Sequence, residues 1–200
     1  IISGLAGSIY GLLWLGASMG EKSFLDDALR RGWDLANSAD RSQASRGHAS
    51  WTTTPRSAGG NLTGFSHGAS GAACALLELA ARTGEAELAS VAERAFSYER
   101  ALFASDQQNW PDLRARPGRA RASAFRPSYP AMWCHGAAGI ALARLRAYEL
   151  TQDPVLRQEA EIGLQTTFAH TRAALRAGEG SYSLCHGLAG NADILEAGNR

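Results

Sequence analysis

The chain has 200 residues and a formal net charge of +1; 45% of its residues are hydrophobic and 20% are charged. These proportions exclude intrinsic disorder and allow one domain with its own core, and the small net charge gives no overall attraction to nucleic acid or to an anionic membrane. There are 38 Ala and 23 Leu but only 2 Val and 6 Ile. Because helix formers outnumber strand formers so strongly, we predict an all-α fold.

Seven helices are predicted along the chain, of two kinds. Apolar runs alternate with segments whose apolar residues follow the i, i+3, i+4, i+7 spacing of a helix packed on one side. In chain order the helices are expected around residues 5–15, 25–33, 72–81, 88–96, 140–148, 156–168 and 191–197. The apolar run at 5–15 is too short to span a bilayer, so we predict no transmembrane segment.

A Gly-x-x-Gly motif precedes or opens each apolar helix. Its second glycine falls at positions 7, 71, 139 and 190, so the motif recurs at intervals of 64, 68 and 51 residues. Each repeat then contains one inner apolar helix and one outer amphipathic helix, which predicts an α/α toroid. Glycine removes side chains where backbones crowd toward a common centre. We expect the residues just before each motif to point at that centre.

Two long connections interrupt the helices, at 40–63 and 105–130. Connections of this length are uncommon unless they are functional, so we expect both near the mouth of the central cavity. The second connection carries five arginines, which either form a solvated surface or attract an acidic segment of a peptide. They are Arg114, Arg116, Arg119, Arg121 and Arg126.

Two Cys-His pairs occupy equivalent places in the repeats. Cys134 and His135 precede one apolar helix, and Cys185 and His186 precede another, 51 residues later. Thiolates and imidazoles are the ligands that Zn²⁺ prefers, and three protein ligands with an open position are typical of a catalytic site. We therefore predict a zinc site. The alternative is a pair of buried apolar cysteines with capping histidines.

His67 occupies the same place in the second repeat but has no neighbouring cysteine. It is available as a general acid or base that faces the same centre, although a histidine before glycine can also be a cap or a core residue. The third cysteine, Cys74, lies inside an apolar helix, where core packing explains it. Three cysteines do not form a disulfide framework and suit a reducing compartment, so we predict a cytoplasmic protein.

These segments resemble the signature segments of the lanthionine synthetase C-like (LanC) family, in the same order. The chain is most similar to the C-terminal cyclase domain of class II (LanM-type) lanthipeptide synthetases, and the resemblance covers essentially all 200 residues. The segments that carry it are Ser3-Gly4-Leu5-Ala6-Gly7, Gly64-Phe65-Ser66-His67-Gly68, Asn109-Trp110-Pro111-Asp112, Trp133-Cys134-His135-Gly136 and Leu184-Cys185-His186-Gly187-Leu188-Ala189-Gly190-Asn191. The resemblance implies a toroid of seven inner and seven outer helices, of which residues 1–200 would be a partial domain truncated at both ends.

The resemblance also implies roles for these residues. Zinc would be held by Cys134, Cys185 and His186, while His67 would transfer a proton and His135, a near neighbour of the metal, is a second candidate for that role. The implied reaction is the addition of a peptide cysteine thiolate to dehydroalanine or dehydrobutyrine in the same precursor peptide. The implied partners are that dehydrated peptide and a dehydratase domain upstream.

Two departures from the family and three alternative functions remain at this point. The family's Asp before the first motif would lie upstream of Ile1. The Arg that some family members place shortly before the first zinc cysteine is missing here, so either the arginine-rich connection replaces that Arg or the site works without it. The alternatives are a LanC-like protein that adds glutathione to dehydrated residues, one that binds peptides or thiols without forming rings, and an α/α-toroid carbohydrate-active enzyme. The last needs paired carboxylates at the cavity, and Asp112 stands alone.

Overall fold

The computed structural model describes residues 4–40, 42, 46–53, 60–114 and 126–199. Over these residues it contains seven α-helices and, in place of strands, only isolated β-bridges. The helices are α1 (Leu5–Met19), α2 (Ser23–Asn37), α3 (Ala69–Thr83), α4 (Ala86–Arg100), α5 (Ala137–Thr151), α6 (Pro154–Ala177) and α7 (Leu188–Ala197). The prediction of an all-α chain, with its helices at these places, is confirmed.

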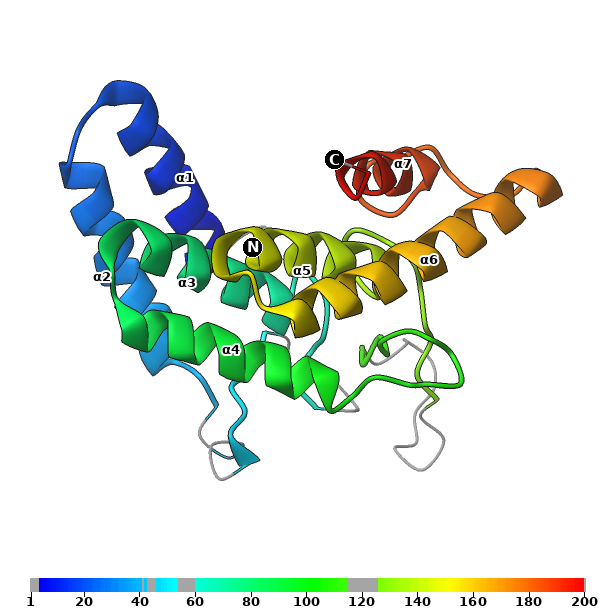
Figure 1. Cartoon of the computed structure of the whole chain (residues 1–200), viewed down its shortest axis with the longest axis horizontal. Helices are drawn as coiled ribbons and strands as arrows, with labels where there is room; N and C mark the ends of the chain where they lie inside the picture. Colours follow the sequence, from blue (N-terminus) through cyan, green and yellow to red (C-terminus); the bar gives the residue numbers. More distant parts are fainter. Residues whose placement is uncertain (1–3, 41, 43–45, 54–59, 115–125, 200) are drawn as a thin grey trace.

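The helices form two layers. Helices α1, α3, α5 and α7 contact one another in that order as an inner row, and α2, α4 and α6 pack behind them as hairpin partners of α1, α3 and α5 (Figure 1). The short turns between the members of each hairpin make them antiparallel neighbours. This alternation of inner and outer helices is the arrangement predicted for an incomplete α/α toroid, and it is confirmed.

Burial differs along the inner row. Every residue of α3 from Ala69 to Ala80 is buried, as expected of a helix that is apolar nearly all round. In α1 only Ala6, Ile9 and Leu13 are buried. The reason is that α3 has an inner neighbour on both sides, whereas α1 contacts only α2 and α3 among the described helices. None of the described helices combines the length and the apolarity that crossing a bilayer requires.

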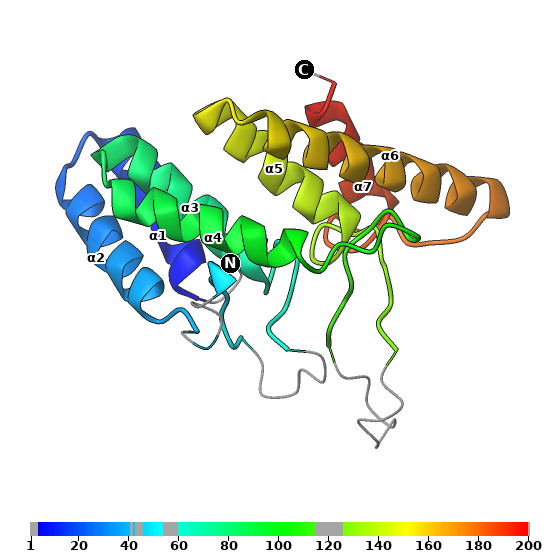
Figure 2. The ribbon, with the colours of Figure 1, turned by 60° about the horizontal axis from the view of Figure 1, so that its bottom comes forward.

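The inner helices α3, α5 and α7 begin directly after the first glycine of their motifs, so that Gly68, Gly136 and Gly187 are their N-cap residues. Their N-terminal ends, together with the described parts of the two long connections, lie at one end of the helical layers (Figure 2). The residues before the motifs are therefore gathered at that end. Cys74 lies away from it, buried in the core, where its thiol donates to the carbonyl of Ala143 at 3.4 Å; the prediction that it packs in the core is confirmed.

Candidate functional site

In the motifs that open α5 and α7, the second glycine lets the preceding loop fold back onto the start of its helix. A Cβ at Gly139 would overlap the carbonyl oxygen of Trp133, and a Cβ at Gly190 would overlap that of Leu184. These carbonyls belong to the residues directly before Cys134 and Cys185. The glycines therefore fix the backbone that carries both cysteines.

The turn around Cys134 is closed further by Gly136. This residue has a φ of +79°, and a Cβ there would overlap the carbonyl oxygen of Pro130. The same carbonyl accepts a hydrogen bond from the Ala137 N–H at 3.2 Å, while the Met132 N–H donates to the carbonyl of His135 at 3.1 Å. Only glycine adopts this backbone without strain and leaves room for the approach.

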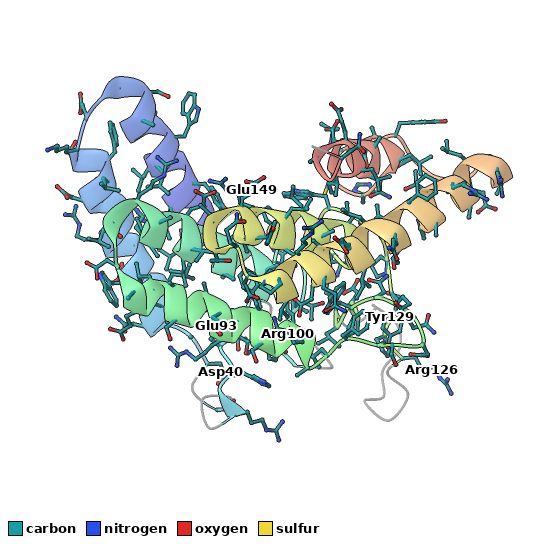
Figure 3. The ribbon with its side chains drawn as sticks, in the orientation of Figure 1. Asp40, Glu93, Arg100, Arg126, Tyr129 and Glu149 are labelled. Atoms are coloured by element: carbon teal, nitrogen blue, oxygen red, sulfur yellow. The ribbon has the colours of Figure 1, made fainter. Side chains whose placement is uncertain are left out.

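Two buried asparagines hold the segment that leads to Cys134. The amide of Asn109 donates to the carbonyls of Tyr129 (3.0 Å) and Pro130 (3.1 Å), and Figure 3 marks Tyr129 on this segment. From α7, the amide of Asn191 donates to the carbonyl of Ala131 at 2.9 Å. The position of Cys134 thus depends on residues that lie far from it in the sequence.

The structure brings the two predicted cysteine ligands together. The N–H of Cys134 donates to the carbonyl of Cys185 at 3.3 Å, and the two thiols lie within hydrogen-bonding reach of each other. Both cysteines are free; Cys134 is buried and Cys185 is half-buried. Burial raises the pKa of the Cys134 thiol, and the neighbouring Cys185 raises it further. The pair therefore has the chemistry of a soft-metal site whose ligands must lose their protons on binding.

The third predicted ligand does not join this pair. His186 follows Cys185 directly, but its side chain is exposed, and its backbone N–H donates to the hydroxyl of Ser183 at 3.3 Å. Within the described part of the chain, no three His, Cys, Asp or Glu side chains gather closely enough to hold a metal ion. Two of the three predicted ligands, Cys134 and Cys185, lie close together, and the zinc site stays a prediction.

The two histidines predicted for proton transfer lie one on the other. The rings of His67 and His135 stack with their centroids 6.0 Å apart and an interplanar angle of 26°. His67 is exposed, whereas His135 is buried. Burial lowers the pKa of His135 to about 4 and lowers the pKa of His67 below 6.5. Both imidazoles are therefore neutral at pH 7.

The buried ring of His135 lacks a well-formed hydrogen bond. Among the described residues no partner is within bonding geometry of either ring nitrogen, although the backbone of Thr63 lies near enough to favour the protonated form. An unpaired buried polar group costs about 1–3 kcal/mol. Such a group in a folded protein calls for an explanation, and a catalytic role is one that places an imidazole in this position.

Arg114, one of the five arginines of the second long connection, is a charged residue at the site. Its guanidinium binds both carboxylate oxygens of Asp112, with Nε–Oδ1 and Nη2–Oδ2 distances of 2.9 and 2.6 Å. Burial raises the pKa of Asp112, but the hydrogen bonds from Arg114 outweigh it and hold that pKa below its ordinary value. Asp112 is the largest cause that raises the pKa of Arg114, and Cys134 and Cys185 raise it further, so the guanidinium lies near the thiol pair. The signal in the sequence was an aspartate two residues before an arginine.

Arg116, Arg119 and Arg121 lie outside the described residues. The described parts of both long connections reach the site, as expected. The hydroxyl of Thr53 donates to the carbonyl of His67 at 2.7 Å, and that of Thr63 donates to the carbonyl of Pro111 at 2.6 Å.

A pocket of about 370 Å³ opens beside Cys185, between α5 and α7. Trp133 and Leu142 wall it on the α5 side, and Ile194 walls it on the α7 side, with Asp193 beside them. Trp133 also packs against Phe65, with ring centroids 5.5 Å apart. Trp133 therefore both walls the pocket and packs against Phe65.

A family model described as lanthionine synthetase C-like protein matches residues 1–200. No curated protein matches the chain.

Proposed function

Because the chain belongs to the lanthionine synthetase C-like family, we propose that it is a zinc-dependent cyclase of the class II (LanM) type. It joins a cysteine of a dehydrated precursor peptide to a dehydroalanine or dehydrobutyrine of the same peptide, which closes a thioether ring. The observation that carries the proposal is the pairing of the Cys134 and Cys185 thiols, which come from two different repeats.

Cys134, Cys185 and His186 are the proposed ligands. The donor set fits zinc because two thiols already meet and the imidazole beside them is exposed, so no packed contact hinders its movement toward them. When bound, Zn²⁺ would keep a substrate thiol deprotonated at neutral pH, where a free thiol with a pKa of about 8.5 is mostly protonated.

His67 carries the proton in this proposal. Its neutral imidazole accepts the proton of the peptide thiol; the sulfur then adds to the β-carbon of the dehydro residue, so that a C–S bond forms and the C=C π bond breaks. The resulting imidazolium returns the proton to the α-carbon of the enolate. The sum is the addition of S–H across a double bond, and no oxidant or reductant is consumed. His67 suits this role better than His135 because its ring is exposed to an incoming peptide.

The pocket beside Cys185 gives the peptide a place to bind. Its walls are mostly apolar, so we expect it to take an apolar side chain next to the reacting cysteine and to exclude water there. The alkene must come from a dehydratase, because addition of a thiol consumes a residue from which water has already been removed.

Replacing His67 by alanine tests the proton-transfer role. We expect the variant to bind zinc as the wild type does, because His67 is not a ligand, and to form rings at least about a hundredfold more slowly, the usual contribution of a general acid–base. The measurements are zinc content by elemental analysis and the loss of free thiol from a peptide with one cysteine and one dehydroalanine. His170→Ala, on the exposed face of α6, is the control. Ring formation at the wild-type rate in His67→Ala would remove His67 from the mechanism.

The same assay separates ring closure from glutathione addition. A dehydrated peptide without cysteine is supplied together with glutathione, and the mass of the product is measured by mass spectrometry. We expect no glutathione adduct under conditions in which the cysteine-containing peptide cyclises. A glutathione adduct without any ring closure would assign the chain to the alternative.

A further inference from the structure

Buried ion pairs join α4, α5 and α6 close to the candidate site. The side chains of Glu99 in α4 and Arg144 in α5 are fully buried, at 0% exposure each. Arg144 also binds Glu159 of α6 through Nε, at 2.6 Å, and Glu159 pairs in turn with Arg100, whose place is labelled in Figure 3. Burying charges is costly unless all of their hydrogen bonds are made. The other hydrogen bonds of Glu99 therefore indicate which part of the chain the Glu99–Arg144 ion pair supports.

Glu99 binds the chain on both sides of His67. Its Oε1 accepts the backbone N–H groups of Gly64 and Ser70, at 2.8 and 2.9 Å. Its Oε2 accepts the hydroxyl of Ser70 and, at 3.1 Å, Nη2 of Arg144. One carboxylate thus holds both ends of residues 64–70, here named the His67 segment.

The His67 segment lies against the turn that carries Cys134. The N–H of Ser66 donates to the carbonyl of Cys134 at 3.3 Å, and a Cβ at Gly64 would come within 2.9 Å of the same oxygen. The ring of His67 stacks on that of His135. The segment therefore covers Cys134, and a shift of the segment would move His67 relative to the thiol pair.

We propose that Glu99, with its charge balanced by Arg144, is a positioning residue that holds the His67 segment against Cys134. Its effect on proton transfer rests on the proposed function, whereas the anchoring of the segment does not. Glu99→Gln isolates the effect because it keeps the volume and replaces one acceptor oxygen by an NH₂ group. In either orientation of the amide, the NH₂ group faces either the two backbone donors or Arg144.

Two of the three cysteines, Cys134 and Cys74, report on the anchoring directly. In the metal-free protein, alkylation with iodoacetamide is followed cysteine by cysteine with mass spectrometry. Cys134 is 9% exposed under the His67 segment, while Cys74 is 1% exposed in the core. We expect Glu99→Gln to speed alkylation of Cys134 about tenfold, as the loss of hydrogen bonds to a charged group implies, and to leave Cys74 protected.

Glu78→Gln is the matched control. Glu78 is also a buried carboxylate paired with an arginine, Arg146, with an Oε2–Nη2 distance of 3.0 Å, but this ion pair joins α3 to α5 away from the His67 segment. In Glu78→Gln, Cys134 should be alkylated at the wild-type rate. An unchanged Cys134 in folded Glu99→Gln would overturn the proposal, as would a Cys74 that accelerates equally, because Glu99 would then support only the fold.

Ser70→Ala decides the question if Glu99→Gln does not fold. It removes one donor to Glu99 and keeps a good helix former, so Cys134 should react about threefold faster; the wild-type rate would contradict the anchor. In the cyclisation assay, a positioning role lowers kcat in Glu99→Gln and leaves KM unchanged. Because alkylation is measured without metal or peptide, its result stands even if the protein closes no rings.

Discussion

Cys134→Ala will bind zinc more than about a hundredfold less tightly than the wild type and will form no rings above the uncatalysed rate. Changes to residues that only support a ligand already cost about 10–100-fold in metal affinity, and this change removes a ligand itself. The truncated side chain also leaves Cys185 without the thiol that lies beside it. Zinc titration against a chromophoric chelator measures the affinity, and the same preparations are assayed for ring formation.

Cys74→Ala is the control for this variant. It removes a thiol of the same kind from the core between α3 and α5, where the sulfur contacts the carbonyl of Ala143. We expect it to lower stability slightly and to keep zinc and activity. If Cys134→Ala retained wild-type zinc affinity, the thiol pair would not be the metal site.

Gly136→Ala is expected to lower the free energy of unfolding by more than about 3 kcal/mol. With a φ of +79° and a ψ of −156°, Gly136 has a backbone conformation that costs a residue with a Cβ about 1–3 kcal/mol, and the Cβ would also overlap the Pro130 carbonyl. Relief of that overlap must open the turn around Cys134, so zinc affinity should fall as well. Denaturation in urea gives the stability, and zinc titration gives the affinity.

Gly84→Ala separates strain from overlap. Gly84 shares the φ of +79° but has a ψ of 8°, in the ordinary left-handed region, and a Cβ there would meet nothing within 4 Å. It should cost about 1–2 kcal/mol of stability and leave zinc affinity unchanged. Equal losses in the two variants would mean that backbone strain alone makes glycine necessary at position 136.

The helices and the place of the site were predictable because their signals are local. The spacing of Leu88, Val91, Ala92 and Phe96 marks α4 without any knowledge of its partners. The repeated Gly-x-x-Gly motif likewise placed Cys134 and Cys185 at the starts of inner helices, and the structure brings their thiols together. Features of this kind can be predicted from the local sequence alone.

The electrostatics depend on contacts between distant segments, which the pattern does not reveal. The sequence treats His67 and His135 alike, yet one is exposed and the other buried, because residues 64–67 fold over the turn that holds His135. The sequence does carry a signal for Glu99, because this residue continues the apolar stripe of α4 three residues after Phe96. A charge on an apolar stripe predicts a buried partner, here Arg144, but does not identify it.

The most direct test of the proposed cyclase is a count of thiols. A peptide with one cysteine and one dehydroalanine is incubated with the zinc-loaded protein and then treated with iodoacetamide, because ring closure leaves the peptide mass unchanged but removes the thiol. We predict that the alkylated peptide disappears with time, and that it persists with Cys134→Ala or after zinc is removed. Complete alkylation after incubation with the zinc-loaded wild type would contradict the assignment.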